Sequence, residues 1–534
     1  MPRSHWGVAW RGLLAFVIVV GCAAGATATA GLLQVKNVVN VIDTQRAIHS
    51  KEITLPQPGK PETLLLVGVD HRYGEGKTPG NTDTMMLVRI NDRSSTINTL
   101  SIPRDLQVNV PGYGIEKINA AYSEPGRNGG PTLLIKTLKD DVFPDLKVNH
   151  LLIVDFSSFA NLINAIGCVY TQVDHRYYNH SEGPIDPTTD YSSIDIQPGY
   201  QKLCGGHGSN LGGANTALAF VRFRHNDSDF VRQARQQDFL RWAKQGFSTG
   251  ELWSRRNVLL NDFARDVQMD AGLHSTSGVI TLFNLAIDAN GSAQKSIPFP
   301  FTGTVANSSN LTFSETAAEQ AYREFMRPTL KRKATPPASP PTGGKHRHGK
   351  KHRAVFTPPP YMSADTGDGE SQAAHLGKPG LPVYYPKYIP EDFQYCFAFT
   401  GNCGVGYEPV TAYADSYPRA YKITGFDGKR YPAYVMTLVA SSGGVSDTAT
   451  GEYASIQGTT WPGAGHAAGP PILRSGYVKR VVNHRLLYEY SQGGRLSVVA
   501  WKTAHGVYWI SNTLENNIPN DQMIAMAASF TRAG

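Results

Sequence analysis

The chain has 534 residues, and at about 150 residues per domain this length predicts several folded units. Hydrophobic residues make up 41% of the sequence, which excludes a wholly disordered or collagen-like chain. The 51 Lys and Arg residues outnumber the 43 Asp and Glu residues, a balance typical of proteins that bind nucleic acids or membrane surfaces. However, nine basic residues and no acidic one lie between Met326 and Asp365, so the rest of the chain is close to neutral. Because no recognition-helix or base-stacking pattern accompanies this local charge, we expect no nucleic-acid partner.

The amino-terminal segment predicts export. No charged residue occurs from Gly12 to Val35, and Arg3 and Arg11 precede this stretch. A run of about 20 apolar residues can span a bilayer, and preceding positive charge keeps the amino terminus inside. The expected segments are a cytoplasmic tail, a single transmembrane helix and a juxtamembrane stretch, over 1–11, 12–35 and 36–61. The bulk of the chain would then lie outside the cytoplasm, anchored in the cell membrane.

Two other fates of this segment stay open. Ala28-Thr29-Ala30 suits a signal-peptidase site, and Val19-Val20-Gly21-Cys22 loosely resembles a lipoprotein processing site with the lipid on Cys22. All three alternatives place the remaining chain outside the cytoplasm.

The other four cysteines agree with export. Cys168 lies near Cys204 in the sequence, and Cys396 lies near Cys403. Two local pairs are typical of disulfides formed in an oxidising compartment, with four buried free thiols as the alternative. No Cys-x-x-Cys pair occurs, which argues against a zinc ribbon.

Strand and helix patterns alternate through the first part of the chain. Continuous apolar or alternating runs predict strands at 63–69, 83–90, 97–102, 150–156 and 169–173. Helices are expected at 118–138, 158–166, 229–245 and 315–326, and 214–224 reads as a helix followed by a strand over 220–224. This order predicts an α/β domain over 62–327, with helices layered on both faces of a central mixed sheet.

A basic, proline-rich linker and a second domain are expected after it. The segment from Arg327 to Ala364 contains eight prolines and almost no large apolar residue, so we assign 328–380 to a linker. Beyond it, Asp427-Gly428 and His505-Gly506 each lie between apolar runs and predict hairpins, and 520–530 reads as a terminal helix. We expect a small α+β domain over 381–534, of unknown role.

The chemistry is expected where the first strands end. Asp70 follows the first predicted strand, and Asp83 opens the second. If these strands are antiparallel neighbours, the two carboxylates meet at one rim of the sheet, and two carboxylates there suit Mg²⁺. Taken alone, Asp at a strand end more often caps a turn.

Several arginines accompany this acidic pair. A planar guanidinium binds phosphate through two parallel hydrogen bonds, so arginines that converge beside a metal pair indicate a diphosphate site. The candidate side chains are Arg72, Arg89, Arg104, Arg222, Arg224, Arg232 and Gln236. In the predicted strand 220–224, Arg222 and Arg224 would share one face.

Together these motifs resemble the LytR-CpsA-Psr family of cell-wall ligases. The likeness covers roughly residues 61–327 and follows the family's motif order. It is carried by Gly68-Val69-Asp70-His71-Arg72, by 83–89, by Ser101-Ile102-Pro103-Arg104-Asp105, by 111–114 and 117–122, and by Arg222-Phe223-Arg224, Asp229, Arg232 and Arg235-Gln236-Gln237.

The resemblance implies an extracytoplasmic, membrane-anchored phosphotransferase. Such an enzyme moves a glycopolymer from a polyprenyl-diphosphate carrier onto peptidoglycan through a phosphodiester bond. By this likeness Asp70 and Asp83 hold Mg²⁺ as cofactor, while the candidate arginines and Gln236 bind the diphosphate. Arg104 acts in catalysis, and Asp105 is either the general base or the residue that orients Arg104.

A second function stays open. A non-catalytic binding or regulatory envelope protein would recognise polyprenyl diphosphate or anionic wall polymer with the same arginines. Such a protein would not need both Asp70 and Asp83, so the intact pair favours the enzyme.

Overall fold

A computed structural model gives the fold of the chain. It describes residues 47–57, 60–69, 82–91, 94, 96–123, 129–179, 194–206, 216–223, 229–246, 255–275, 278, 293–327, 357–364, 367–396, 417–442, 445–446, 452–461, 473, 477–492 and 494–534. The predicted transmembrane segment lies outside this set, as do Asp70, Arg72, Arg224 and Cys403. Within the set, no helix has both the length and the apolar character needed to cross a bilayer.

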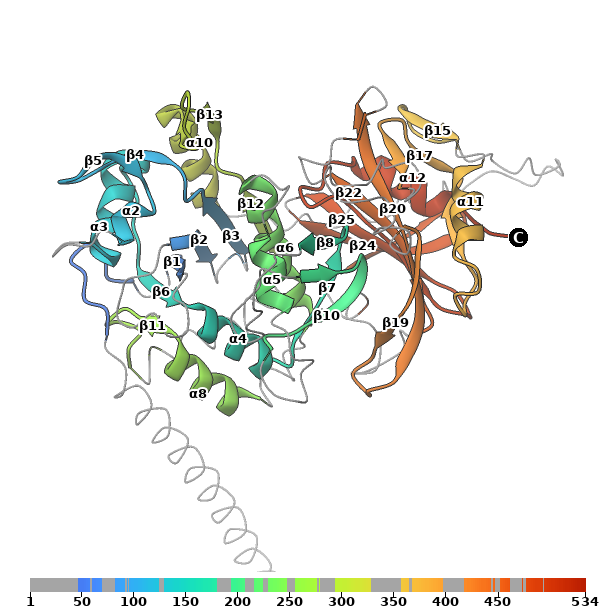
Figure 1. Cartoon of the computed structure of the whole chain (residues 1–534), viewed down its shortest axis with the longest axis horizontal. Coiled ribbons are helices and arrows are strands. Elements are labelled where there is room, and N and C mark those ends of the chain that lie inside the picture. The colour runs from blue at the N-terminus through green and yellow to red at the C-terminus, as the bar shows by residue number, and fades with distance from the viewer. Residues whose placement is uncertain are drawn as a thin grey trace, which may run out of the picture.

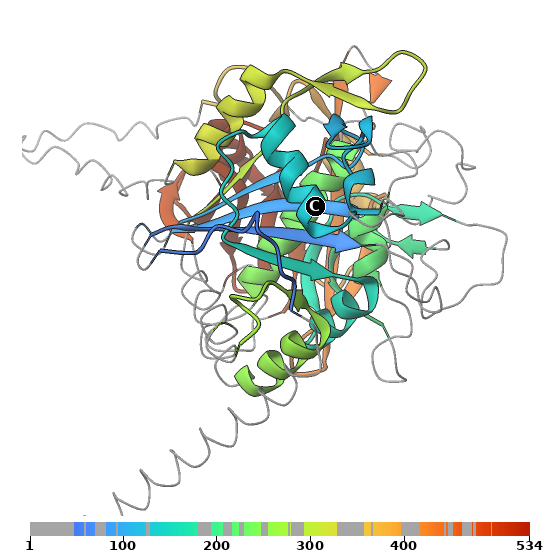
Figure 2. The same cartoon turned by 90° about the vertical axis from the view of Figure 1, so that its left-hand side faces the viewer.

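A six-stranded mixed sheet forms the centre of the first domain (Figures 1 and 2). Its order is β11 (Gln268–Met269), β6 (His150–Val154), β1 (Glu62–Val69), β2 (Thr82–Asn91), β3 (Thr96–Ile102) and β12 (Ala293–Ile297). β1, β2 and β3 pair antiparallel in sequence, whereas β6 and β12 join the sheet in parallel. The predicted antiparallel pairing of the first two strands is confirmed.

Helices cover both faces of this sheet, as predicted. One face carries α2 (Ala120–Ser123), α3 (Pro131–Thr137), the π-helix η1 (Leu138–Val142) and α10 (Glu315–Met326), and the other carries α4 (Phe156–Ala165), α6 (Asp229–Gly246) and α8 (Arg256–Asp266). The strands supply both cores because their side chains alternate: Leu65 and Val67 pack under α3 and α10, and Leu64 packs under α8. The continuous apolar run of β1 therefore reflects burial on both sides.

Short hairpins and one disulfide complete this domain. The hairpins pair β4 (Gln107–Val110) with β5 (Gly114–Lys117), β8 (Tyr177–Asn179) with β9 (Ile194–Ile196), and β13 (Phe301–Thr304) with β14 (Leu311–Phe313). β7 (Val169–Val173) pairs with β10 (Gly199–Leu203), and the predicted Cys168–Cys204 disulfide joins this pair across 36 residues. The chain-entropy model gives such a loop about 3–4 kcal/mol of stabilisation. Cys396 is also disulfide-bonded, and its predicted partner Cys403 lies outside the described residues.

The carboxy-terminal domain is built on a nine-stranded antiparallel sheet (Figure 1). The strands are β18 (Phe393–Tyr395), β19 (Arg419–Thr424), β20 (Arg430–Ser442), β21 (Val445–Ser446), β22 (Tyr453–Thr459), β23 (Val478–Val482), β24 (Arg485–Gln492), β25 (Arg495–Lys502) and β26 (Val507–Ser511). Both predicted hairpins are confirmed, as β19–β20 and β25–β26. α12 (Asn520–Ser529) matches the predicted terminal helix and packs on β25, and β27 (Phe530–Arg532) follows and pairs with β16 (Tyr384–Pro386).

The folded domain begins before residue 381, so the predicted linker boundary is wrong. β15 (Met362–Ala364) pairs with β17 (Tyr388–Pro390), and α11 (Asp368–His375) follows β15. Ala373 and Leu376 of this region belong to the domain's apolar core. These few apolar residues at helical spacing suffice to bury a short helix inside a stretch whose overall composition indicates a linker.

The two domains share one apolar core. Tyr170 and Trp242 of the first domain pack in the same cluster as Trp461 and Trp509 of the second. Several hydrogen bonds cross the same boundary. Among them, Tyr200 N–H donates to Tyr421 Oη at 2.8 Å, Arg176 N–H donates to Tyr417 Oη at 2.8 Å, and Arg419 donates to the Pro198 carbonyl at 3.0 Å. Figure 1 shows the second sheet against the side of the first domain that carries β7, β10 and α6. The second domain is therefore packed against the first and not merely tethered to it.

Candidate functional site: an arginine cluster at the rim of the sheet

The site is centred on Asp83, near the start of β2. Its carboxylate is 6% exposed. Val69 pairs with Thr82, so the end of β1 lies beside the start of β2, as the sequence predicts. Asp70 follows β1 directly but lies outside the described residues, and the proposed meeting of the two carboxylates stays a prediction.

Three arginines from three elements converge on Asp83. Arg104, which follows β3, donates Nη1 to Asp83 Oδ1. Arg222 donates Nη2 to Asp83 Oδ2 at 2.6 Å, and Arg232 of α6 donates Nη2 to the Asp83 carbonyl at 3.2 Å. Within the described part of the chain, these three guanidinium groups outnumber the neighbouring carboxylates of Asp83 and Asp105, an arrangement that favours binding of a multiply charged anion.

Arg222 reaches this cluster from a helix, and the predicted strand over 220–224 is wrong. α5 (Thr216–Arg222) is helical to its last residue. Its Ala, Leu and Phe side chains are buried on all sides, so the alternation that predicted a strand has no exposed face to match. The Arg222 guanidinium lies over the ring of Phe156, with its Cζ 4.0 Å from the ring centroid, and this contact holds the charge in place. Arg224 lies outside the described residues.

Gln236 joins the elements of the site to one another. It donates Nε2 to Thr84 Oγ1 at 2.9 Å and to the Val221 carbonyl at 3.1 Å. Both bonds are largely buried, and they connect α6 to β2 and to the end of α5. Gln236 therefore lies beside Asp83 as predicted, in a position that also sets the place of Arg222.

Arg235 is a positioning residue that the candidate set omitted. It is fully buried and donates to the Phe220 and Phe223 carbonyls at 3.2 and 2.8 Å, and to Tyr177 Oη at 3.0 Å. These bonds satisfy carbonyl groups at the carboxy-terminal end of α5, where Arg222 sits. Its place three residues after Arg232 puts it in the same motif, but the sequence does not tell which arginine faces the substrate and which faces the core.

Asp105 is paired with two cations. Its Oδ1 accepts from Lys117 Nζ at 2.7 Å, and its Oδ2 lies 3.6 Å from Arg104 Nε. The carboxylate is 7% exposed. Both carboxylate oxygens thus lie against cations, one of them Arg104, and this geometry favours the orienting role over that of general base.

Arg89 is not part of the cluster. It lies six residues after Asp83 on β2, which at about 3.3 Å per residue separates their Cα atoms by roughly 20 Å. Arg89 donates to Thr63 Oγ1 at 2.9 Å, and burial lowers the pKa of its guanidinium. The structure thus brings together Asp83, Arg104, Arg222, Arg232 and Gln236, and leaves Arg89 at the opposite end of the sheet.

One of the two predicted Mg²⁺ ligands, Asp83, lies among the described residues. Asp83 offers the hard oxygen ligands that Mg²⁺ prefers, but both of its carboxylate oxygens accept hydrogen bonds from arginines. No group of three or more His, Cys, Asp and Glu side chains suited to a metal ion occurs among the described residues.

Comparison with known proteins assigns the family. Residues 31–325 match the LytR_cpsA_psr family. The chain is 30% identical over 240 residues to the polyisoprenyl-teichoic acid–peptidoglycan teichoic acid transferase TagT of Bacillus subtilis, covering 44% of this chain and 69% of that protein. It is 32% identical over 189 residues to the probable cell wall biosynthesis protein LcpB of Corynebacterium glutamicum, covering 33% of this chain and 39% of LcpB.

Among solved structures, B. subtilis TagV matches at 22% identity with a TM-score of 0.38, covering 50% of this chain and 97% of TagV. The family match spans more than half of the chain, and it includes every residue of the arginine cluster. The chain belongs to the LytR-CpsA-Psr family.

Proposed function

We propose that this protein is a phosphotransferase that moves a glycopolymer from a polyprenyl-diphosphate carrier onto peptidoglycan. The observation that carries the proposal is the convergence of three arginines on one residue at the rim of the sheet: Arg104 and Arg222 bind the Asp83 carboxylate, and Arg232 binds its main-chain carbonyl. The name of TagT, a transferase that joins polyisoprenyl-linked teichoic acid to peptidoglycan, supports the same substrate class.

The arginines supply binding and charge stabilisation. Guanidinium groups bind the diphosphate oxygens, and they stabilise the charge that develops on the phosphoryl and leaving-group oxygens as the bond breaks. Because Gln236, Arg235 and Phe156 fix the arginine-bearing elements, little reorganisation is needed when the substrate arrives.

Mg²⁺ is part of the proposal, with Asp83 and Asp70 as its ligands. Bound there, it would neutralise charge on the diphosphate and polarise the phosphoryl oxygens. Asp83 becomes available to a cation when Arg104 or Arg222 turns from its carboxylate to the incoming phosphate. Substrate and cation would then bind together more tightly than either alone.

The place of the reaction is also proposed. Segment 12–35 anchors the chain in the cell membrane, and the folded domains lie on the outer side, where a lipid-linked glycopolymer and peptidoglycan are both present. The Cys168–Cys204 disulfide suits this oxidising side.

The test is transfer of a labelled lipid-linked glycopolymer to peptidoglycan fragments with Mg²⁺. Arg222→Lys keeps the charge but removes the two-pronged contact, and we expect turnover to fall by about 10²-fold. The matched control is Arg265→Lys, because Arg265 is exposed, pairs with Asp262 and Asp266 of its own helix α8, and is not a member of the arginine cluster. If the wild type transfers the glycopolymer and Arg222→Lys transfers it at the same rate, the proposed mechanism is refuted. Tight binding of the lipid without any transfer would favour the non-catalytic binding protein.

A further inference from the structure

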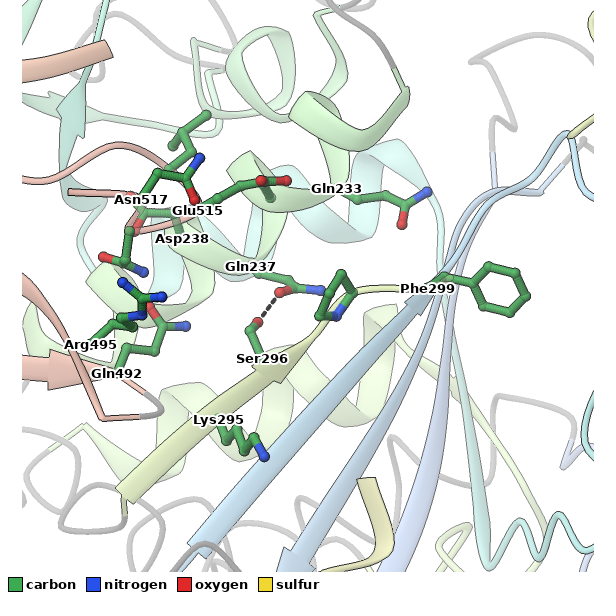
Figure 3. Close-up of a pocket in the computed structure, with 14 residues that line it drawn as sticks. Gln233, Gln237, Asp238, Lys295, Ser296, Phe299, Gln492, Arg495, Glu515 and Asn517 are labelled. Carbon is green, nitrogen blue, oxygen red and sulfur yellow. Dashed lines mark hydrogen bonds between the residues drawn. The ribbon is translucent and has the colours of Figure 1, made fainter. Parts of the chain in front are cut away.

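A cavity lies between the two domains, and α6 forms part of its wall (Figure 3). Its volume is about 320 Å³. Gln237 of α6 and Ser296 of β12 line it from the first domain. Gln492 at the end of β24, Arg495 at the start of β25, and the loop residues Asn516 and Asn517 line it from the second. We call it the interdomain cavity.

The lining favours a neutral ligand rich in hydroxyl groups. Amide side chains occur on both walls, and each amide both donates and accepts hydrogen bonds, as a sugar hydroxyl does. The charged side chains balance, because Lys295 and Arg495 are matched by Asp238 and Glu515. This balance disfavours a phosphate group, and the many amide and charged side chains of the lining disfavour a lipid tail. Figure 3 shows the Phe299 ring directed away from the other lining residues.

Two of the lining side chains are available to a ligand. Gln492 is 9% exposed, and within the described part of the chain neither it nor Arg495 makes a side-chain hydrogen bond or ion pair. A smaller cavity adjoins this one, and there Arg241 Nη1 and Ser511 Oγ are buried without a hydrogen-bond partner. Buried polar groups without partners cost about 1–3 kcal/mol each, so hydroxyl groups from a ligand or from water stabilise this boundary.

The interdomain cavity is connected to the arginine cluster through α6, which lines the cavity and carries Arg232 and Gln236. Gln237 donates to Ser101 Oγ at 2.7 Å and accepts from Ser296 Oγ, the contact drawn in Figure 3. Ser101 lies on β3 three residues before Arg104, and Gln237 directly follows Gln236 on α6. A chain held in the cavity therefore lies against α6, the helix that carries two residues of the cluster, and α6 is bonded there to β3, which leads to Arg104.

We propose that the interdomain cavity binds one or two sugar units of a glycan chain whose reacting end lies at the arginine cluster. The volume is at the lower end of the roughly 300–1,000 Å³ typical of ligand sites, which suits a mono- or disaccharide. The identity of that glycan, as donor polymer or as peptidoglycan acceptor, rests on the proposed function. The second domain then serves as one wall of a glycan site that the first domain alone does not form.

The test measures the binding of two sugars to the full chain by saturation-transfer NMR and by titration. The probes are the N-acetylglucosamine–N-acetylmuramic acid disaccharide of peptidoglycan and a neutral hexose disaccharide. The cavity variants are Gln492→Leu, which keeps the side-chain volume, and Arg495→Ala. The control is Arg532→Ala, an exposed arginine on β27 that does not line the cavity.

We expect saturable binding of at least one probe, weakened about tenfold or more by each cavity variant and unchanged by the control. Preference for the acetylated disaccharide assigns the cavity to the acceptor, and preference for the hexose disaccharide assigns it to the donor polymer. No saturable binding of either probe, or binding that both cavity variants leave intact, would overturn the proposal. Since binding needs no transfer, a wild type that binds sugar but transfers nothing would refute the proposed function and leave this site standing.

Discussion

Buried charges gather at both ends of the central sheet, and the two ends pair them differently. At the Asp83 end, Arg104 and Arg222 share one carboxylate, and Arg232 binds the main-chain carbonyl of the same residue. At the other end, His150 at the start of β6 is held between Asp270 Oδ2 at 3.2 Å and Glu62 Oε2 at 3.5 Å. Among the described residues, the first arrangement has more guanidinium groups than carboxylates, and an excess of positive charge is expected where an anionic ligand binds. In the second, one imidazole lies between two carboxylates of the chain itself.

The pKa values at the His150 end fit a structural role. Burial acts to lower the pKa of His150, but hydrogen bonds and charge from Asp270 and Glu62 outweigh it and raise the pKa to about 9. Asp270 also accepts from the Leu151 and Gly272 N–H groups, and despite its burial these bonds and His150 lower its pKa. These groups satisfy one another and need no ligand.

The largest expected effect is on turnover at the Asp83 end. In Arg104→Ala, transfer should fall by about 10²–10³-fold, because a donor aimed at developing phosphoryl charge is lost. Asp83 keeps its bond to Arg222, so the midpoint of thermal unfolding should change little. The transfer assay and a melting curve on one preparation give both values. A large drop in melting temperature with normal turnover per folded molecule would assign Arg104 a structural role instead.

At the His150 end the expected effect is on stability and its pH dependence. The folded-state pKa of His150, about 9, lies above the unfolded value of about 6.5. Its contribution, at most roughly 3 kcal/mol, is therefore complete below about pH 6.5 and is lost as the pH rises toward 9. Melting temperatures of the wild type should fall over this range. His150→Gln should start lower and show a flatter pH profile, while its turnover per folded molecule stays normal. A wild-type profile that is flat from pH 6.5 to 9 would contradict the assigned pairing.

A smaller effect is expected for Asp105, the candidate with two possible roles. If Asp105 orients Arg104, Asp105→Asn should lower kcat about tenfold and leave the shape of the pH–rate profile unchanged. Loss of a general base would instead lower kcat by several orders of magnitude and remove the acidic limb of the pH–rate profile. The profile thus separates the roles even where the rates overlap. Lys117→Met, which removes the other cation that pairs with Asp105, is the matched variant and should also lower kcat modestly.

The sequence predicts the central sheet well, because each of its main strands is an apolar run buried on both faces. The meeting of β1 with β2, and with it the place of Asp83, follows from two adjacent strands and a short connection. Arg222 and Arg232 are harder to place, because they are far from Asp83 in sequence and depend on how α5 and α6 pack. The motif order of the family resemblance assigned both arginines to the site beside Asp83, although the strand predicted at the end of α5 was wrong.

Other features had no signal in the sequence. Tyr421, Trp461 and Trp509 read as core residues of an independent domain, and nothing in their spacing tells that part of that core belongs to a neighbour. The interdomain cavity depends on the same docking. A pattern of apolar residues predicts that a residue is buried, but not which element it packs against. The same limit applies to the contacts of Arg89.

The smallest effect is expected for Arg89, for which the family resemblance and the structure make opposite predictions. The resemblance assigns Arg89 to the diphosphate, so its loss should impair transfer. The structure places it at the His150 end, where its Nε is buried without a hydrogen-bond partner and its Nη1 donates to Thr63 Oγ1. Within the described residues no carboxylate pairs with it.

Arg89→Met keeps the apolar stem and removes a half-buried charge that folding desolvates. We therefore expect unchanged transfer and a free energy of unfolding that is equal or up to about 1 kcal/mol higher. Denaturant unfolding and the transfer assay measure the two, with Arg323→Met, an exposed arginine of α10, as the control for losing a surface charge. If Arg89→Met folded normally but lost transfer activity, the His150 end of the sheet would take part in the reaction and would not be purely structural. The contrast between the two ends would then fail.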